Sequence, residues 1–271
     1  MKITVLVENT SKRDDLKTVH GLGVYIETPK HKMLFDLGPD DTVFDNAMTL
    51  GIDLGEIDTV IISHGHYDHG GALASFLEIN KTARIYARRQ AFEPHYADVG
   101  DDKLFVGLDA VLAEDKRVTL TDDTMRIDDE LFVFSDVDGI LDTQSRRALL
   151  KKTSDGYEQD DFDHEQSLIV TAEGKAVLFS GCSHSGADVI LTAALRRQPD
   201  IKTVFGGFHM YNPNTGATEP EALITALAGR LSAHDAVFYT CHCTGEKAFG
   251  LMRETMGEKL RYIQTGAVVE L

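Results

Sequence analysis

Four potential metal ligands stand close together in the segment SHGHYDHGG at residues 63–71. They are His64, His66, Asp68 and His69. Neutral imidazole nitrogens and a carboxylate suit borderline ions such as zinc, iron or manganese, and the neighbouring glycines let the backbone approach an ion closely. Side chains two positions apart can point to one side, so we expect His64 and His66 to share one ion and Asp68 and His69 to face a second. The alternative is a solvated histidine-rich turn, but so many ligands directly after an apolar run argue against it.

Apolar, β-rich runs indicate the elements that hold this segment. Residues 58–63, DTVIIS, predict a buried strand that ends at the histidine cluster. Earlier runs at 2–8, 22–28 and 32–36 predict strands of a meander. The apolar spacing within 40–52 predicts a helix between the meander and the buried strand.

The rest of the chain shows strands first and then alternating helices and strands. The predicted strands lie at 83–87, 167–173, 175–181, 201–207, 236–240 and 260–265, and the predicted helices at 72–80, 185–198, 219–234 and 245–257. This order favours two packed sheets with helices outside, an α/β sandwich formed as one domain over 1–271. Residues 136–163 are polar and too long for a compact connection, and they predict a lid or insert over the active site.

Composition narrows the function classes. The 271 residues are 42% hydrophobic and 26% charged, as in an ordinary globular protein. A net charge of −17 disfavours nucleic acid as a partner, because binding to phosphate backbones depends on clustered Lys and Arg. No apolar run approaches the ~20 residues of a membrane span, and the first residues lack a signal-peptide pattern. Three cysteines, an odd number, suit a reducing compartment, so we expect a cytoplasmic protein.

The motif H-x-H-x-D-H at 64–69 resembles the hallmark of the metallo-β-lactamase superfamily. The elements LFDLG at 34–38 and KAVLFSG at 175–181 are also similar to that superfamily. The resemblance implies a four-layer αββα sandwich with a dinuclear metal site at one edge of the sheets. Further pieces resemble the subgroup related to 7,8-dihydropterin-6-methyl-4-(ribofuranosyl)aminobenzene 5′-phosphate synthase: SHGHYDHGGAL, SGCSHSGA, GGFHM and CHCTGEKA.

The resemblance also implies ligands from the second half of the chain. His184, in the turn GCSHSG, is expected to join the first ion, and His242, which follows a predicted strand, the second. His209, in GGFHM, is open to three interpretations: an acid that faces the substrate, a metal ligand that competes with His242, or a structural histidine. Asp36, in LFDLG, is expected to orient a ligand histidine from outside the metal shell.

Two positions depart from the superfamily pattern. Cys182 stands where the bridging Asp is usual, and it is either a thiolate ligand of the second ion or a small buried residue. His164, in DHEQSL, stands near the place of another usual ligand and is an alternative to His184 for the first ion. We expect two divalent ions, zinc in first place and manganese or iron as alternatives. The histidines without supporting neighbours are expected to be structural: His20, His31, His95 and His234.

These residues favour metal-assisted hydrolysis of a small ester, lactone or phosphate ester. Asp68 would accept a hydrogen bond from the attacking water, and His209 would protonate the leaving oxygen. One alternative is a synthase-like transferase that releases pyrophosphate from a phosphorylated, pterin-like substrate; others are a di-iron redox protein and a non-catalytic metal-binding module. Four cations in the predicted lid are candidates for phosphate contacts: Arg146, Arg147, Lys151 and Lys152. The alternative is that they form a solvated helix face. The sequence makes no prediction of oligomeric state.

Overall fold

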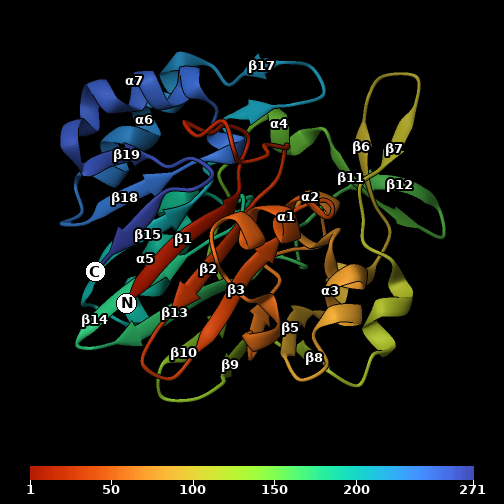
Figure 1. Cartoon of the computed structure of the whole chain (residues 1–271). Coiled ribbons are helices and arrows are strands. Elements are labelled where there is room, and N and C mark those ends of the chain that lie inside the picture. The colour runs from red at the N-terminus through yellow and green to blue at the C-terminus, as the bar shows by residue number, and fades with distance from the viewer.

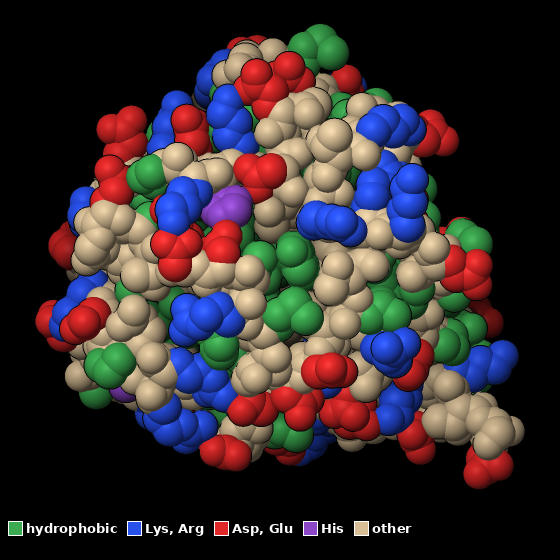
Figure 2. Space-filling view, turned by 90° about the horizontal axis from the view of Figure 1, so that it is seen from below, with side chains coloured by type: hydrophobic (Ala, Val, Ile, Leu, Met, Phe, Trp, Pro, Cys, Tyr) green, Lys and Arg blue, Asp and Glu red, His purple; other side chains and the backbone are tan.

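The computed structural model describes all residues, 1–271. Two seven-stranded sheets lie against each other, and helices cover their outer faces (Figure 1). On the face drawn in Figure 2, acidic and basic side chains are interspersed. None of the helices combines the length and the apolar character needed to pass through a membrane.

The first sheet contains the meander and the strand that ends at the histidine cluster. Its order is β20 (Val268–Glu270), β1 (Lys2–Val7), β2 (Gly23–Glu27), β3 (Lys32–Leu37), β4 (Thr59–Ile61), β5 (Arg84–Arg88) and β8 (Val118–Thr121). β1, β2 and β3 pair antiparallel, and β3, β4, β5 and β8 pair parallel. β1, β3 and β4 therefore point the same way, so their carboxyl ends lie at one edge of the sheet.

The second sheet repeats this arrangement. Its order is β19 (Leu260–Tyr262), β18 (Val237–Thr240), β15 (Ile201–Gly206), β14 (Lys175–Phe179), β13 (Ser167–Ala172), β10 (Leu131–Phe134) and β9 (Thr124–Arg126). β9, β10, β13 and β14 pair antiparallel, and β14, β15, β18 and β19 pair parallel. The predicted rhythm of the two halves is thus confirmed.

The helices fall into two outer layers. The longer ones are α1 (Thr42–Thr49), α3 (Leu73–Ile79), α5 (Ala187–Arg197), α6 (Glu221–Ser232) and α7 (Glu246–Met256). α1 and α3 pack on the first sheet, and α5, α6 and α7 pack on the second. Short turns of helix complete the set: α2 (Tyr67–Gly70), α4 (Gln144–Arg147), η1 (Leu54–Glu56), η2 (Arg89–Phe92), η3 (Ala110–Glu114), η4 (His242–Thr244) and η5 (Gly257–Lys259).

Three apolar clusters separate the four layers. In β3, Leu34 points into the cluster beneath α1 and α3, whereas its neighbour Phe35 points into the cluster between the sheets. In β14, Leu178 faces the helices and Phe179 faces the other sheet. This alternation is what buries both faces of each sheet. The predicted αββα sandwich is therefore confirmed.

Two smaller sheets lie beside the sandwich. One has four strands in the order β12 (Gly156–Gln159), β11 (Leu149–Thr153), β6 (His95–Asp98) and β7 (Lys103–Phe105), and the other pairs β16 (Tyr211–Asn212) with β17 (Ala217–Thr218). The polar segment 136–163 thus contains α4, β11 and β12. Lys151 and Lys152 lie in β11, so the alternative of a solvated helix face at these two lysines is wrong.

Candidate metal centre

The candidate ligands all follow the carboxyl ends of strands. In the first sheet, β3 ends at Asp36-Leu37 and β4 leads into the loop with His64 and His66. In the second sheet, the loops after β14, β15 and β18 carry His184, His209 and His242. The two sheets therefore deliver side chains from distant parts of the sequence to one edge of the sandwich, where open α/β sheets commonly hold their ligands.

The hydrogen bonds around Ser63 define the tautomer of His64. The Ser63 hydroxyl donates to Asp36 Oδ2 at 2.7 Å, and the Ser63 backbone N–H donates to Asp36 Oδ1 at 2.7 Å. Because this hydroxyl has only one proton, its contact of 2.8 Å with His64 Nδ1 requires the ring to donate. His64 Nε2 therefore carries a lone pair.

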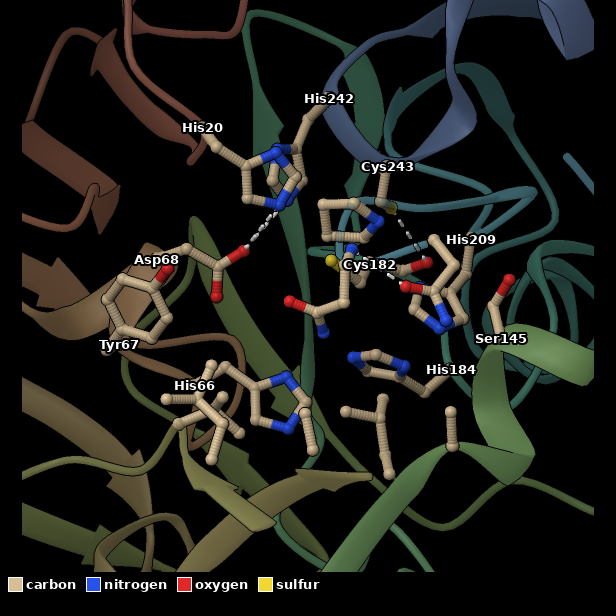
Figure 3. Close-up of a pocket in the computed structure, with 18 residues that line it drawn as sticks. His20, His66, Tyr67, Asp68, Ser145, Cys182, His184, His209, His242 and Cys243 are labelled. Atoms are coloured by element: carbon tan, nitrogen blue, oxygen red, sulfur yellow. Dashed lines mark hydrogen bonds and ion pairs between the residues drawn. The ribbon is translucent and has the colours of Figure 1, made fainter. Parts of the chain in front are cut away.

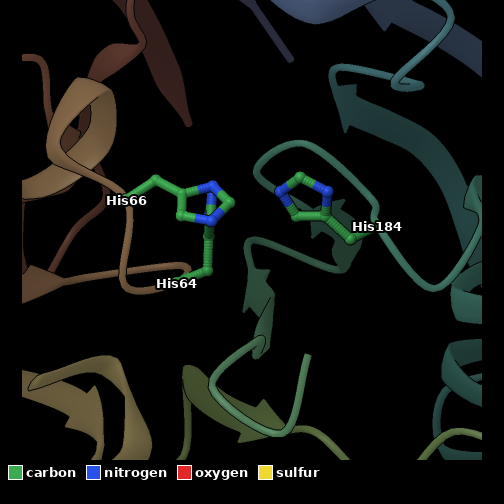
Figure 4. Close-up of side chains that lie close together, drawn as sticks. All are labelled: His64, His66 and His184. Carbon is green, nitrogen blue, oxygen red and sulfur yellow. The ribbon is translucent and has the colours of Figure 1, made fainter. Parts of the chain in front are cut away.

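That lone pair belongs to a first cluster, formed by His64, His66 and His184 (Figure 4). One ring nitrogen of each lies within 4.8 Å of the others, and all three residues are buried. Nε2 of His64, Nε2 of His66 and both nitrogens of His184 have no hydrogen-bond partner. Burial lowers the pKa of all three rings well below the usual range, with neighbouring histidines adding to the effect. Neutral, unpartnered nitrogens that converge in this way fit a divalent ion.

His184 is held from both its backbone and its ring. Glu165 accepts hydrogen bonds from the backbone N–H of His184 at 2.6 Å and from that of Ser185 at 3.0 Å. The Phe162 ring stacks on the His184 ring with centroids 4.3 Å apart. The side chain is therefore fixed by packing while its nitrogens stay free.

A second cluster contains His69, His242 and Asp68. His69 Nδ1 donates to Asp36 at 2.6 Å, and His242 Nδ1 donates to Asn9 Oδ1 at 2.9 Å. The Nε2 atoms of these two rings lie only 3.3 Å apart. With both Nδ1 atoms protonated, neither neutral ring has a proton on Nε2, so two lone pairs face each other and a proton or a cation between them would stabilise the pair.

Charges around this second cluster support the same conclusion. Asp68 Oδ2 lies 3.2 Å from His242 Nε2 and 3.8 Å from His69 Nε2. Burial works to lower the pKa of His69, but the Asp36 and Asp68 carboxylates outweigh it and raise that pKa to about 9. Burial likewise works to raise the pKa of Asp68, but His69 and His242 hold it well below its usual range. Without metal, a proton on His69 thus occupies the place that a cation could take.

Cys182 lies between the two clusters. Its Sγ is 3.1 Å from His69 Nε2, and within 4.8 Å it forms one group with His64 and His69 and another with His184 and His209. Burial raises the pKa of the Cys182 thiol well above its usual range, and Cys243 adds to the effect. A metal ion would deprotonate such a thiol. The position agrees with the expected thiolate ligand, and that role stays a prediction.

His209 lies beside the first cluster. Its ring centroid is 4.3 Å from that of His184, and neither of its nitrogens has a hydrogen-bond partner. It lines the pocket described below, so its position agrees with a role as proton donor or as metal ligand, and both roles stay predictions.

Four non-glycine residues of the site adopt left-handed backbone conformations. They are Asp36 (φ 59°), Ser183 (φ 56°), His209 (φ 52°) and His242 (φ 51°). Such conformations are uncommon for non-glycine residues in general and cost roughly 1 kcal/mol or more each. Their concentration at one edge of the sandwich is typical of a functional site, where the fold imposes a geometry on its side chains.

His164 does not fit the alternative of a ligand for the first ion. Its Nδ1 accepts a hydrogen bond from the Gly65 backbone N–H at 2.9 Å. The ring proton is therefore on Nε2, which lies 3.3 Å from Asp160 Oδ2. This tautomer leaves no lone pair for an ion, so His164 supports the loop that carries His64 and His66, and His184 completes the first cluster.

The predicted phosphate contacts are not brought to the site. Arg146 is buried with its guanidinium over the Phe162 ring, and Arg147 pairs with Asp142 at the surface. Lys151 pairs with Asp161, and Lys152 lies over the Tyr157 ring. None of the four cations lines the pocket.

The structure adds residues that the sequence reasoning missed. His20 lies with its Nε2 3.4 Å from Asp68 Oδ2, its ring 4.4 Å from that of His242, and burial lowers its pKa to about 4. Glu8 and Asn9 also contact His242. Glu8 and Asn9 directly follow β1, which runs in the same direction as β3 and β4, so their place at the carboxyl end of a strand was the sequence signal for them.

Residues of both clusters line one pocket: His66 and His184 from the first, and Asp68 and His242 from the second (Figure 3). Apolar side chains form one side: Ala97, Leu104, Val106, Ala148 and Leu149. β16 contributes Asn212, the loop after it contributes Pro213 and Asn214, and α4 contributes Ser145. No Lys or Arg is among the lining residues. The predicted lid segment thus contributes to the wall through Ser145, Ala148 and Leu149, and its movement as a lid stays a prediction.

Comparisons with known proteins show which family the chain belongs to. The sequence profile of the metallo-beta-lactamase superfamily matches residues 18–214. A Methanocaldococcus jannaschii protein named 7,8-dihydropterin-6-methyl-4-(beta-D-ribofuranosyl)-aminobenzene-5′-phosphate synthase is 25% identical over 268 residues, which cover 93% of this chain and 90% of that protein.

Solved structures extend the likeness to the whole fold. A metal-dependent hydrolase of the beta-lactamase superfamily is 26% identical, with a TM-score of 0.83 over 100% of this chain and 99% of that chain. Zn²⁺-bound PqqB from Methylobacterium extorquens shares the fold at 10% identity, with a TM-score of 0.60 over 100% of both chains. The chain therefore belongs to the metallo-beta-lactamase superfamily.

Proposed function

We propose that this protein hydrolyses a small carboxylic ester or lactone with two divalent ions, zinc in first place, held by the two histidine clusters. One observation carries the proposal: the unpartnered imidazole nitrogens of the first cluster lie beside a second cluster in which two histidine Nε2 atoms are 3.3 Å apart, and residues of both clusters line a single pocket. Divalent ions at such a site would supply an activated water molecule near neutral pH and would polarise the carbonyl oxygen of the ester or lactone.

The chain's own residues supply the remaining chemistry. The Asp68 carboxylate faces the pocket and is placed to accept a hydrogen bond from the attacking water. His209, on the other side of the pocket, is placed to donate a proton to the leaving oxygen. His64, His66 and His184 would hold one ion, and Asp68, His69 and His242 the other, with Cys182 between them.

The pocket wall favours an ester or lactone over a phosphate ester. Its apolar side chains stabilise an uncharged acyl or aryl group through burial of apolar surface. A phosphate group beyond the metal site would need a cation, and no Lys or Arg lines the wall. The net charge of −17 further supports a small molecule rather than nucleic acid as the substrate.

The synthase-like transferase is the second candidate. It is favoured by the relative that carries a synthase name and aligns with 93% of this chain at 25% identity. That reaction would require the pocket to accept a phosphorylated substrate. The same apolar wall that supports an ester therefore speaks against it.

The test is hydrolysis by metal-depleted protein to which Zn²⁺ or Mn²⁺ is added back. We expect turnover of p-nitrophenyl acetate or dihydrocoumarin to return with metal, and bis(p-nitrophenyl) phosphate to be a poorer substrate. His66→Ala should lose both activity and bound metal, whereas His234→Ala, at the amino end of β18 away from the site, should keep both. Activity of the His66→Ala protein with unchanged metal content would overturn the proposal. Bound iron together with oxygen consumption would instead support the redox alternative, and bound metal with no turnover would support the non-catalytic one.

A further inference from the structure

The Asn9 side chain contacts two histidines: His242, which belongs to the second cluster, and His20, which lies beside that cluster. Its Oδ1 accepts from the Gly21 backbone N–H at 3.3 Å and from His242 Nδ1 at 2.9 Å. Its Nδ2 contacts the His242 backbone carbonyl at 3.5 Å and His20 Nδ1 at 3.3 Å. A backbone N–H can only donate and a carbonyl can only accept, so these two backbone groups define which end of the amide is oxygen.

This orientation of Asn9 dictates the tautomers of both rings. His242 Nδ1 must donate to Oδ1, which leaves the His242 Nε2 lone pair directed into the cluster. His20 Nδ1 must accept from Nδ2, which places the single proton of the neutral His20 ring on Nε2. That Nε2 lies 3.4 Å from Asp68 Oδ2, so it is a donor to the carboxylate and has no lone pair for a metal ion.

We propose that Asn9 and His20 are positioning residues, which together set the Nε2 lone pair of His242 and hold the Asp68 carboxylate in place. The inference rests on the proposed metal site and extends it. One amide acts on two ligands of the same ion: directly on His242, and through His20 on Asp68. Partners of this kind, one step outside the ligands, orient them and typically change metal affinity 10- to 100-fold.

The decisive variant is Asn9→Asp. A carboxylate at this position still accepts from His242 Nδ1, but it can no longer donate to His20. In the neutral form of the His20 ring, which measurement at about pH 9 favours, the proton should therefore lie on Nδ1, and a lone pair would then face Asp68. The added negative charge alone would strengthen Zn²⁺ binding, because a carboxylate near the site attracts cations. A weaker affinity would therefore come from the changed tautomer and not from the charge.

Two substitutions of His20 complete the set. His20→Phe keeps a ring against His242 but removes the donor, and His20→Gln keeps a donor. Zn²⁺ affinities are measured by competition with a chromophoric chelator, and ring protonation by NMR of the ¹⁵N-histidine-labelled protein. Neither measurement depends on turnover.

We expect Asn9→Asp and His20→Phe to weaken the second Zn²⁺ by about 10- to 100-fold and the first by less than about threefold, with His20→Gln near wild type. In wild-type protein the His20 proton should be on Nε2, and in Asn9→Asp on Nδ1. Unchanged affinity for both ions in Asn9→Asp and His20→Phe, or a wild-type His20 proton on Nδ1, would overturn the inference. If a variant fails to fold, the wild-type NMR spectrum still decides. If no ester is hydrolysed but the affinities shift as stated, only the proposed function fails.

Discussion

Asp36→Asn is the substitution that most directly tests how the metal centre is oriented. Asp36 is fully buried and accepts three hydrogen bonds: from the backbone and hydroxyl of Ser63 and from His69 Nδ1. Asparagine has nearly the same shape and also tolerates the left-handed backbone of this position. The change therefore replaces one acceptor oxygen by an NH₂ donor and leaves the backbone undisturbed.

The expected loss follows from those bonds. Ser63 Oγ and His69 Nδ1 both donate to the carboxylate, and bonds to a charged group contribute roughly 1.5–3 kcal/mol each, against about 1 kcal/mol for neutral ones. If both re-form as neutral bonds, the free energy of unfolding of the metal-free protein falls by about 1–4 kcal/mol. To re-form them, His69 must move its proton to Nε2 and Ser63 must donate to His64. Both rings then lose the lone pair that faces the site, so each ion should bind about 10- to 100-fold more weakly.

Two measurements check this prediction. Urea unfolding of the metal-free protein gives the stability difference, and Zn²⁺ competition with a chelator gives the two affinities. Asp53→Asn is the matched control, since it removes a carboxylate charge at a surface position where the side chain accepts only from the Gly55 backbone. Zn²⁺ affinities in Asp36→Asn within about threefold of wild type at both sites would refute the tautomer argument.

Three further predictions concern pH, the pocket wall and the surface. The pKa of His69 in the metal-free protein is about 9, and a metal ion must displace that proton, so metal affinity at the second cluster should rise about tenfold per pH unit below pH 9. Calorimetry in buffers of different ionisation enthalpy should detect the released proton. An affinity that does not change between pH 6 and 8 would contradict this prediction. Leu104→Lys places a cation in the apolar wall of the pocket. It should raise KM for p-nitrophenyl butyrate several-fold and lower KM for p-nitrophenyl phosphate. Equal changes of KM for the two substrates would argue against the wall as the site that binds the acyl group. Burial opposes the shift at His31, but hydrogen bonds to Asp58 and Asp128 raise its pKa, so the stability it contributes is present below its unfolded pKa of ~6.5 and lost above its folded pKa. His31→Asn should therefore destabilise the protein more at pH 6 than at pH 9 in urea unfolding, and the reverse order would exclude the ion pair as the cause.

Strands with continuous apolar sequence could be predicted, and strands that depend on distant partners could not. β4 and β13 to β15 are buried on both sides, so their residues alone indicate them. β11 is polar and half-exposed, and it exists because it pairs with β6, about fifty positions earlier in the chain. β20, only three residues long, likewise depends on β1 at the other end of the sequence. No local pattern contains such pairings.

The same limit applies to the metal centre. His64, His66, Asp68 and His69 could be predicted because they lie within one short loop. Asn9 could not, because its partner His242 is 233 positions away in the sequence. Nor does sequence tell which nitrogen of a histidine holds the proton.

The hydrogen bonds also show that the two clusters are not independent. Asp36 Oδ2 accepts from His69 directly and from Ser63, which in turn accepts from His64, so one oxygen orients a nitrogen of each cluster. Asn9 acts only on the second cluster. Asp36→Asn should therefore weaken both ions, whereas Asn9→Asp should weaken one. If the two variants gave the same pattern, the loss would come from a general disturbance of the loops and not from tautomers set one ring at a time.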